Sequence, residues 1–459
     1  MVNLQDIVEH QDIFQRHLLF FLSKQEVGRM QAVSKRMGPI NDDNCWKILL
    51  QRDYEITDNI DAPEYDAYKR SFSKISAQKS IKDAYKHWTI FEHETCGGIK
   101  ARHMIQAIGL WSRCENVLIR KELTNIVESL EPPPSRSFFE RAARNLPSSL
   151  LAFYAIHAGQ SSLNPRSSDG DFFAGLFGSY SCYNDFYSMR LLHINEEYLS
   201  STSNSTFIIG INLGNPRISL VIDYSENPNG SMYFRLGNHR HLVCSSGILS
   251  YFQAYIEKLE IGVYEPSTIH PEAPISRGIC LFPEAGEGVS IAVTNGLEVR
   301  ASARWFPERW HGPMSFGYSI RIRLVETDPN NSDAVSYPIQ YQLVARNWIF
   351  EYEDGTVNRV SGEGAVGRNP LFFRRADRTS GFIDLGPAGS GQTLLNTIFQ
   401  YQSQSGPVPG TSSDDVTKVM NTRVRGTFSF VPGSISAPTG ELFLVNVGEF
   451  PLRVQLPFF

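Results

Sequence analysis

The sequence predicts a multidomain protein with a helical N-terminal region, a central α+β region and a C-terminal all-β region. Three changes of pattern along the 459 residues support this division. Apolar residues recur every three or four positions up to about residue 130, which is typical of amphipathic helices. Strand-like runs then alternate with helical stretches. After about residue 272 only short segments with period-two alternation follow.

The N-terminal region shows helical spacing with few residues that would interrupt it. Phe14, Leu18, Phe21 and Leu22 fall on one face of a helix. Three consecutive prolines at 132–134 end the helical pattern, because proline cannot continue a helix. We therefore expect a boundary close to these prolines.

The central region contains both strand-like and helix-like runs. Residues 206–210 and 218–222 have the apolar, β-branched composition of strands, and residues 249–259 form a helix-like run that closes the region. Strands followed by a packing helix are typical of an α+β domain.

The C-terminal region predicts an all-β sandwich. Residues 290–293, 318–324 and 427–431 alternate apolar and polar side chains, and Gly, Pro and Asn residues separate such runs. Two stretches rich in small residues, 386–392 and 407–415, have the composition of loop insertions.

A Gly-x-Gly-x-x-Gly pattern occupies residues 362–367. In dinucleotide-binding enzymes this pattern opens a helix whose N-terminus holds the pyrophosphate. Here Pro370 follows closely and blocks a helix, so we reject a dinucleotide site and predict no cofactor. Two interpretations stay open: a backbone that needs positive φ and close strand approach, or a ligand- or peptide-binding loop. The residues of such a loop are Gly362, Glu363, Gly364 and Gly367.

One set of side chains is a candidate zinc site, since imidazole and thiolate bind zinc: His239, His241 and Cys244. A fourth ligand is not evident. A solvated strand edge is therefore the preferred interpretation, and no metal is predicted.

Composition and charge exclude several function classes. The net charge of −5 gives no bulk attraction to nucleic acid or to a membrane, and neither partner is predicted. We find no secretory signal pattern and no apolar run long enough to span a membrane. The six cysteines are scattered, which fits a reducing compartment, so we expect the cytoplasm, with the nucleus second. The sequence motifs of serine hydrolases, zinc proteases and P-loop enzymes are absent, so we expect no enzyme and no catalytic residues.

Three short motifs in the first fifty residues resemble the F-box family. They are Phe-Leu-Ser at 21–23, Val-Ser-Lys-Arg at 33–36 and Trp-Lys-Ile-Leu at 46–49, in the family's order. The resemblance implies a small helical domain over 1–55 that binds a Skp-type adaptor and, through it, a cullin-RING ligase. The residues expected at the adaptor are Phe14, Leu18, Leu22, Val33 and Trp46.

The central region resembles the SUKH family, which opens with Leu-Pro and a helix. Leu146 and Pro147 precede the run 148–154, and the later strand-like runs keep the family's order. The resemblance implies a protein-binding scaffold. Exposed aromatic residues anchor many protein interfaces, so the aromatic-rich stretch 177–187 and the rim around Glu363 are candidate contacts to client proteins. The alternative is that these aromatic side chains fill the core.

The C-terminal region resembles the ApaG family. Arg346-x-Trp348 is followed by the glycine pattern and by Pro370, and the segments 399–403 and 424–428 resemble two further family strands. This resemblance implies a fibronectin-like β-sandwich. An insertion at about 374–395 departs from the family, and we expect it to cover or extend the surface next to the glycine pattern.

The order F-box, SUKH-like domain and ApaG-like domain implies a substrate-recognition subunit of an SCF ubiquitin ligase that recruits client proteins. The predicted divisions are 1–55, 56–135 (a helical linker region), 136–271 and 272–459. The Leu-Pro pair that usually opens an F-box is absent. This keeps open a scaffold that acts without a cullin, and the glycine pattern keeps open a small-ligand-binding ApaG-type protein.

Overall fold

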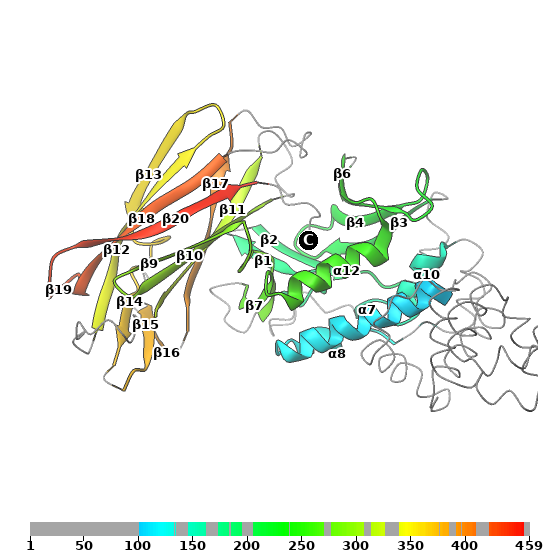
Figure 1. The fold of residues 1–459 in the computed structure, drawn as a ribbon, viewed down its shortest axis with the longest axis horizontal. Helices are drawn as coiled ribbons and strands as arrows, with labels where there is room; N and C mark the ends of the chain where they lie inside the picture. Colours follow the sequence, from blue (N-terminus) through cyan, green and yellow to red (C-terminus); the bar gives the residue numbers. More distant parts are fainter. Residues whose placement is uncertain are drawn as a thin grey trace, which may run out of the picture.

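The computed structural model shows two structured parts side by side, one of helices and a sheet and one of strands alone (Figure 1). We call them the α+β part (residues 101–288) and the sandwich (residues 289–453). The predicted domain over 1–55 and its five adaptor-binding residues lie outside the described residues. The structure describes residues 101–132, 134, 146–161, 173–182, 185–194, 205–237, 239–269, 277–306, 314–325, 339–375, 377–384, 392–395, 397–409 and 422–453.

The helices of the α+β part pack on one another through a shared aromatic cluster. The indole of Trp111 lies 5.0 Å from the ring of Phe153 and 4.7 Å from the ring of Phe252, and its Nε1 donates to the Phe153 carbonyl at 2.9 Å. These rings join helices that are far apart in the sequence. The helices are α7 (Ala101–Arg120), α8 (Thr124–Glu128), α10 (Ser148–Tyr154) and α12 (Gly247–Glu260).

Helix α12 ends in a backbone motif that only glycine accommodates easily. Gly262 has φ +76°, and the Val263 N–H donates to the Lys258 carbonyl at 2.9 Å, while the Gly262 N–H reaches the Leu259 carbonyl. This pattern satisfies the last carbonyls of the helix and turns the chain sharply into β7.

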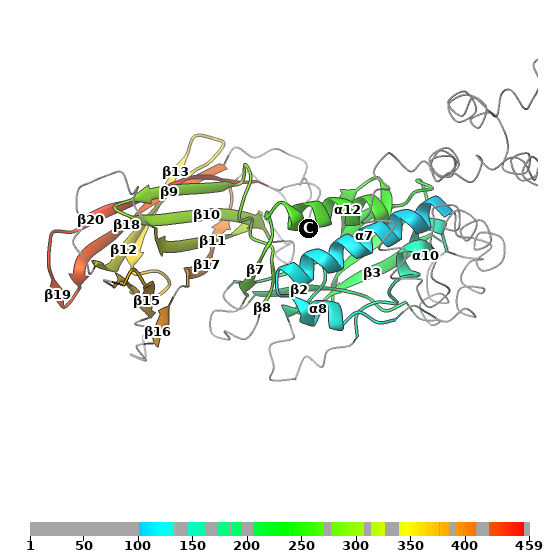
Figure 2. The same ribbon diagram turned by 60° about the horizontal axis from the view of Figure 1, so that its bottom comes forward.

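An eight-stranded sheet lies against these helices, and Figure 2 shows α7 and α12 running across it. Strands β1 to β6 form an antiparallel series, after which β8 pairs in parallel with β1 and β7 closes the edge. The bounds are β1 (Ser179–Cys182), β2 (Asp185–Leu191), β3 (Thr206–Asn212), β4 (Ile218–Asp223), β5 (Ser231–Leu236), β6 (His239–Cys244), β7 (Glu265–Thr268) and β8 (Arg277–Cys280).

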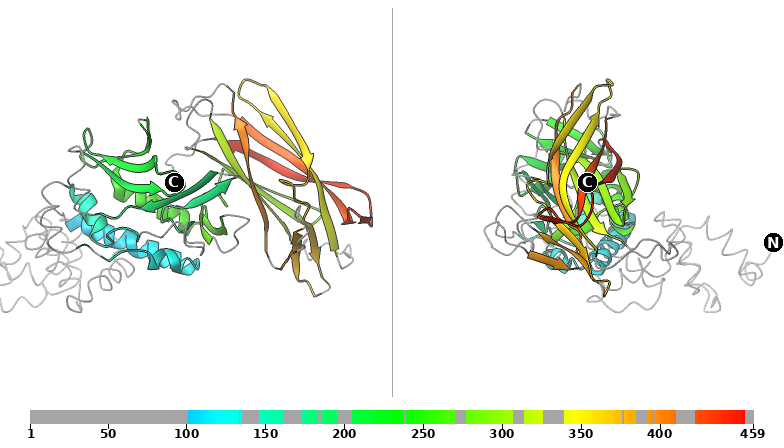
Figure 3. Two further views of the ribbon diagram at one scale, coloured as in Figure 1. Left: turned by 180° about the vertical axis from the view of Figure 1, so that it is seen from behind. Right: turned by 90° about the vertical axis from the view of Figure 1, so that its left-hand side faces the viewer.

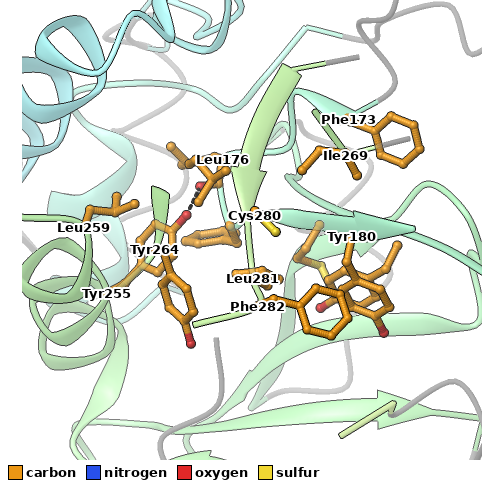
Figure 4. Close-up of a cluster of buried hydrophobic side chains, with 14 of the residues drawn as sticks. Phe173, Leu176, Tyr180, Tyr255, Leu259, Tyr264, Ile269, Cys280, Leu281 and Phe282 are labelled. Atoms are coloured by element: carbon orange, nitrogen blue, oxygen red, sulfur yellow. Dashed lines mark hydrogen bonds between the residues drawn. The ribbon is translucent and has the colours of Figure 1, made fainter. Parts of the chain in front are cut away.

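The core between α12 and the sheet is drawn in Figure 4. The Tyr255 hydroxyl donates to the Leu176 carbonyl at 2.7 Å, which satisfies the polar end of a fully buried ring. Tyr180 and Phe282 lie on the other side of this cluster, where the α+β part meets the sandwich.

The sandwich is built of two sheets, and no helix follows α12 in the described residues. The smaller sheet has the order β17-β11-β10-β9. The larger has the order β16-β15-β14-β12-β18-β19, with β13 paired to β12 and β20 paired to β18. The bounds are β9 (Val289–Thr294), β10 (Leu297–Trp305), β11 (Ser315–Leu324), β12 (Ile339–Glu351), β13 (Val357–Glu363), β14 (Leu371–Arg374), β15 (Ser380–Asp384), β16 (Gln392–Leu395), β17 (Phe399–Pro407), β18 (Thr422–Ser434), β19 (Ala437–Pro438) and β20 (Phe443–Leu452).

Aromatic side chains from both sheets fill the space between them. Tyr318 of β11 lies 5.5 Å from Trp348 of β12, and Phe428 of β18 packs 5.7 Å from the same indole. The strand alternation seen in the sequence places these rings inward. The predicted all-β sandwich is confirmed, and the described chain is mostly β-sheet with few helices.

Two features concern the predicted divisions of the chain. Helix α7, which falls in the predicted linker region 56–135, packs on α12 and α10 in the core of the α+β part. Strand β8, which follows the predicted division at residue 272, pairs with β1 of the first sheet. The division points themselves stay predictions.

The insertion at 374–395 extends the larger sheet. Strands β15 and β16 add in succession to the outer edge of β14, so this segment adds to the sheet rather than looping away from it. It lies on the side of the sandwich where the glycine pattern ends.

Candidate functional site

The glycine pattern forms a tight turn between β13 and β14. Ala365 and Arg368 exchange backbone hydrogen bonds of 2.8 and 3.1 Å, and the two residues between them, Val366 and Gly367, have φ +53° and +74°. Two consecutive left-handed residues are typical of a type I′ turn. The strands on either side of it, β13 and β14, both pair with β12 and not with each other. Strand β14 follows the turn, so the predicted absence of a helix after the glycines is confirmed.

Close approach of backbone and side chains explains the glycines themselves. A Cβ on Gly364, where φ is +54°, would lie 2.4 Å from the Arg368 carbonyl oxygen. A Cβ on Gly362 would lie 3.1 Å from the Arg346 guanidinium. Arg346 Nη1 donates to the carbonyls of Glu363 and Gly364 at 3.0 and 2.9 Å, so these acceptors are already engaged within the chain. The backbone interpretation accounts for this geometry. A ligand at Gly362, Glu363, Gly364 and Gly367 stays a prediction.

Arg368, at the end of the turn, points away from the glycines and toward the insertion. Its guanidinium forms a two-bond ion pair with Asp384 of β15 and lies 4.9 Å from the ring centroid of Phe399. The turn therefore anchors one arginine on the side of the sandwich that faces the α+β part.

The outer face of the smaller sheet is polar and yet largely covered. Period-two alternation points apolar side chains of β10, β11 and β17 inward and polar ones outward. The strand register places Arg300, Arg321 and Gln400 side by side across the sheet. A neighbouring row consists of Ser302, Ser319 and Gln402, which are 0%, 0% and 7% exposed.

The α+β part is what covers this polar face, and Figure 3 shows the two parts side by side from behind. Tyr180 of β1 stacks on Phe306 with a ring separation of 5.0 Å, and the Arg304 guanidinium lies 4.4 Å from the Tyr180 ring. Gly317 makes room for Phe306, because a Cβ there would lie 2.0 Å from the Phe306 Cζ. A contact between buried aromatic rings thus holds the two parts together.

Beside this contact an open cavity of about 820 Å³ lies between the two parts. It is lined by β7 and β8 of the α+β part and by strands of both sandwich sheets. Four arginines and two glutamates are among the lining residues, and the arginines are Arg277, Arg300, Arg321 and Arg368. Its volume falls in the range of ligand pockets.

Glu284 organises the centre of the arginine wall. Arg300 and Arg321 face each other on neighbouring strands, where two like charges repel. The Glu284 carboxylate ion-pairs with both, at 3.4 Å from Arg300 Nη1 and in closer contact with Arg321 Nη1. Burial raises the pKa of Glu284, and the two arginines oppose that rise. Arg321 is 4% exposed, so the carboxylate partner is what makes its burial tolerable.

A chain of polar side chains crosses the cavity wall from one part to the other. Ser267 Oγ of β7 donates to Gln400 Oε1 at 2.8 Å, and Gln400 Nε2 donates to Ser319 Oγ at 3.2 Å. These bonds tie β7 to the smaller sheet of the sandwich, so the cavity has a defined shape.

The aromatic stretch 177–187 does not form an exposed surface. Phe177, Tyr180 and Tyr187 are 1%, 0% and 0% exposed, so the proposal that they anchor clients is wrong for these residues and they fill the core. Sequence alternation could not distinguish a partner protein from the neighbouring part of the same chain. Glu363 is exposed, as expected for a rim residue.

The histidine pair of β6 also differs from expectation. β6 is an edge strand as predicted, but His241 is buried and packs 5.2 Å from Trp305 of the sandwich, because the second part covers that edge. Among the described residues no cluster of three His, Cys, Asp or Glu side chains could hold a metal ion. No helix within the same residues has the length and apolar character to cross a membrane.

Comparison with known proteins assigns the region that carries the glycine turn. Residues 308–377 match the family model of the ApaG domain. This part of the chain is thus similar to an ApaG domain. An ApaG protein of Anaeromyxobacter dehalogenans (strain 2CP-C) is 36% identical over 83 residues, which cover 18% of this chain and 58% of that protein. The ApaG resemblance is therefore confirmed for the centre of the sandwich.

A second relative extends along nearly the whole chain. The F-box protein SKIP16 of Arabidopsis thaliana is 22% identical over 476 residues, which cover 96% of this chain and 97% of that protein. Together with the ApaG match, this fits an F-box/ApaG protein. A solved structure from Bordetella pertussis, provisionally named ApaA, is 25% identical and covers 34% of this chain and 93% of its own. At a TM-score of 0.22 we draw no conclusion from it.

Proposed function

We propose that this protein is the substrate-recognition subunit of an SCF ubiquitin ligase. Residues 1–55 would bind a Skp-type adaptor through Phe14, Leu18, Leu22, Val33 and Trp46, and the α+β part and the sandwich would hold client proteins. The observation that carries the proposal is the end-to-end similarity to an F-box protein, because it includes the N-terminal segment as well as the ApaG domain.

The architecture of the described residues supports a role in presenting surface. A helical segment of about fifty residues is too small to hold both an adaptor and a client, since a standard interface takes about 800 Å² from each partner. The two described parts share one continuous buried core, so they offer clients a single fixed surface. We propose a non-enzymatic role in the cytoplasm, with the nucleus as a second location.

Two other functions differ from this one in a measurable way. A scaffold that acts without a cullin would bind clients and no adaptor, and the missing Leu-Pro pair favours it. A small-ligand-binding ApaG-type protein would use the turn at Gly362, Glu363, Gly364 and Gly367. The carbonyls of Glu363 and Gly364 are already bonded to Arg346, which argues against that turn as the ligand site.

Adaptor binding tests the proposal directly. The full chain should recover a Skp-type adaptor and a cullin in a pull-down, and Leu22→Asp should abolish this recovery, because the variant would bury an unpaired carboxylate at a cost of several kcal/mol. Leu22→Met keeps the volume and apolar character and serves as the matched control, with recovery expected near that of the unchanged chain. Equal recovery by the Asp variant, or none by the unchanged chain, contradicts the proposal.

A further inference from the structure

The cavity between the two parts is bounded by the outermost strands of all three sheets. Strand β7 ends the sheet of the α+β part, β17 ends the smaller sandwich sheet and β16 ends the larger one, as the described strands are ordered. Residues of each of these strands line the cavity. An edge strand carries backbone N–H and C=O groups on its unpaired side, which an extended polypeptide can bind.

The cavity also offers guanidinium groups that are not fully bonded within the described part of the chain. Arg368 binds Asp384 through Nε and Nη2, which leaves Nη1 without an acceptor among the described residues. Arg300 uses Nη1 and Nη2 toward Glu284 and Glu298, which leaves Nε in the same condition. The side chains of Arg300 and Arg368 are 27% and 21% exposed, so an incoming carboxylate can reach them.

The wall formed by the insertion is apolar. Phe382 of β15 and Leu394 of β16 line the cavity, as does Ile398, which follows the insertion and is 47% exposed. An exposed isoleucine next to arginines suits a ligand that carries both apolar and acidic groups, since the acidic groups can contact the arginines while the apolar groups contact the isoleucine.

We propose that this cavity binds an extended acidic segment of a client protein, with carboxylates at Arg300 and Arg368 and apolar side chains against Ile398. The proposal rests on the client-binding role proposed above and names the chemical class of the segment that is recognised. Glutamate or aspartate at alternate positions places the carboxylates on one side of an extended chain and leaves the other side for apolar residues.

The sheet edges favour a polypeptide over a free small anion. A small dicarboxylate would use the arginines alone and leave the apolar wall and the strand edges uncovered. A polypeptide segment uses all three features, and the alternation of its side chains matches the separation of the charged and apolar walls.

A pair of synthetic peptides provides the probe. The first is a fluorescent peptide about eight residues long in which glutamate alternates with valine, and the second has glutamine in place of every glutamate. We expect saturable binding of the glutamate peptide to the full chain by fluorescence anisotropy, weaker at about 500 mM salt than at about 50 mM, and binding of the glutamine peptide at least about tenfold weaker.

Matched variants locate the site. Arg300→Gln and Arg368→Gln should each weaken the glutamate peptide by about tenfold, because each removes a charged donor from the wall. Arg423→Gln is the control with the same charge change: Arg423 is exposed, pairs with Glu449 and does not line the cavity, so binding should be unchanged. Thermal unfolding of every variant shows that it is folded before binding is compared. Arg300 lies in β10 and Arg368 lies in the turn before β14, so one variant remains informative if the other fails to fold.

Several outcomes overturn the inference. They are equal binding of the two peptides, no binding of either, unchanged binding by both cavity variants, and displacement of the peptide by free glutarate at the same concentration. The last would assign the cavity to a small anion. Adaptor recovery by the same protein preparation is measured in parallel, so loss of peptide binding with intact adaptor recovery rejects this inference alone.

Discussion

Gly364 and Gly367 sit in one turn but are required for different reasons. Both have positive φ, at +54° and +74°, but only Gly364 also lies against the Arg368 carbonyl, and nothing lies within 4 Å of a Cβ placed on Gly367. Gly367→Ala should therefore destabilise the protein only through its left-handed backbone conformation, by about 1 kcal/mol. Gly364→Ala adds a clash with backbone that cannot move away, for a total of at least about 2 kcal/mol.

Thermal unfolding of the two glycine variants checks this order. Gly364→Ala should lower the unfolding midpoint more than Gly367→Ala, and each should leave adaptor recovery unchanged. If Gly367→Ala proves the more damaging, the turn geometry described here is wrong and the glycine must serve another purpose.

Lys258, in the last turn of α12, gives the protein a pH dependence at alkaline pH. Burial, together with the smaller effect of the Arg304 charge, lowers the pKa of its ammonium group to about 8. An unfolded lysine titrates near 10.4, so between these values the unfolded chain binds more protons than the folded one. Stability from this group therefore rises as the pH increases from about 8 to about 10.4.

Replacing this lysine by methionine tests the pH dependence. Lys258→Met keeps the apolar stem and removes the buried charge, so at pH 7 it should be more stable than the unchanged chain by an amount on the order of 1 kcal/mol, and this advantage should shrink above pH 8. Lys121→Met is the contrasting variant, because Lys121 pairs with Glu265 at 2.6 Å and its loss should not stabilise the protein. An advantage of Lys258→Met that is constant with pH would rule out titration as its cause.

At the scale of elements, strand β11 determines how closely the two parts meet. Its inward residues build the sandwich core. Its outward residues, Gly317, Ser319 and Arg321, face the α+β part. The Phe306 ring fits because Gly317 has no side chain and Tyr180 stacks on the ring from the other side. Strand β11 thus packs its apolar side in the sandwich core and its polar side against the α+β part.

A pair of compensating substitutions tests this contact. Gly317→Ala should destabilise the protein by about 1–3 kcal/mol through overpacking against the buried Phe306 ring. Phe306→Leu removes the clashing ring atoms, so the double variant should be more stable than the sum of the two single effects by at least about 1 kcal/mol. Calorimetry of the four proteins provides the measurement. Additive effects would show that the two residues are not in contact.

The insertion hairpin of β15 and β16 is the second element with a consequence beyond its own sheet. It supplies Asp384, which orients Arg368, and it supplies the apolar wall of the cavity through Phe382 and Leu394. The segment that we predicted to depart from the ApaG family therefore supplies part of the cavity wall.

At the scale of the whole molecule, the first described helix belongs to the core rather than to a spacer. Ten apolar side chains of α7, α8 and the turn between them are buried in the described structure. A side chain of this kind contributes roughly 1.5–3 kcal/mol on burial, and a whole domain is stable by only about 5–15 kcal/mol. The α+β part cannot lose these helices and remain folded.

Two shortened chains test this conclusion. A chain that begins at residue 101 should unfold cooperatively and keep Trp111 in a buried, hydrogen-bonded environment by fluorescence. A chain that begins at residue 136, the predicted start of the central domain, should lack a cooperative transition in the α+β part. Cooperative unfolding of the shorter chain with full stability would show that α7 and α8 are dispensable.

The sequence by itself determined the class of the two described parts. Period-two alternation specified the strands of the sandwich, Pro370 excluded a helix after the glycines, and the Arg346 to Pro370 motifs indicated ApaG. These features depend on neighbours along the chain, so a sequence pattern carries them. The same reasoning predicted that the 374–395 insertion lies beside the glycine turn.

Only the tertiary structure decided which faces are free. Phe177 to Tyr187 had the composition of an exposed aromatic surface, yet Phe177, Tyr180 and Tyr187 are buried. The outward Arg300, Arg321 and Gln400 had the composition of a solvated surface, yet they line a cavity beside the α+β part, and Arg321 is 4% exposed. Alternation distinguishes the two sides of a strand but not what lies opposite each side, because that depends on contacts between different elements, such as Tyr180 with Phe306. The cavity, its arginine wall and its three sheet edges arise from that packing alone.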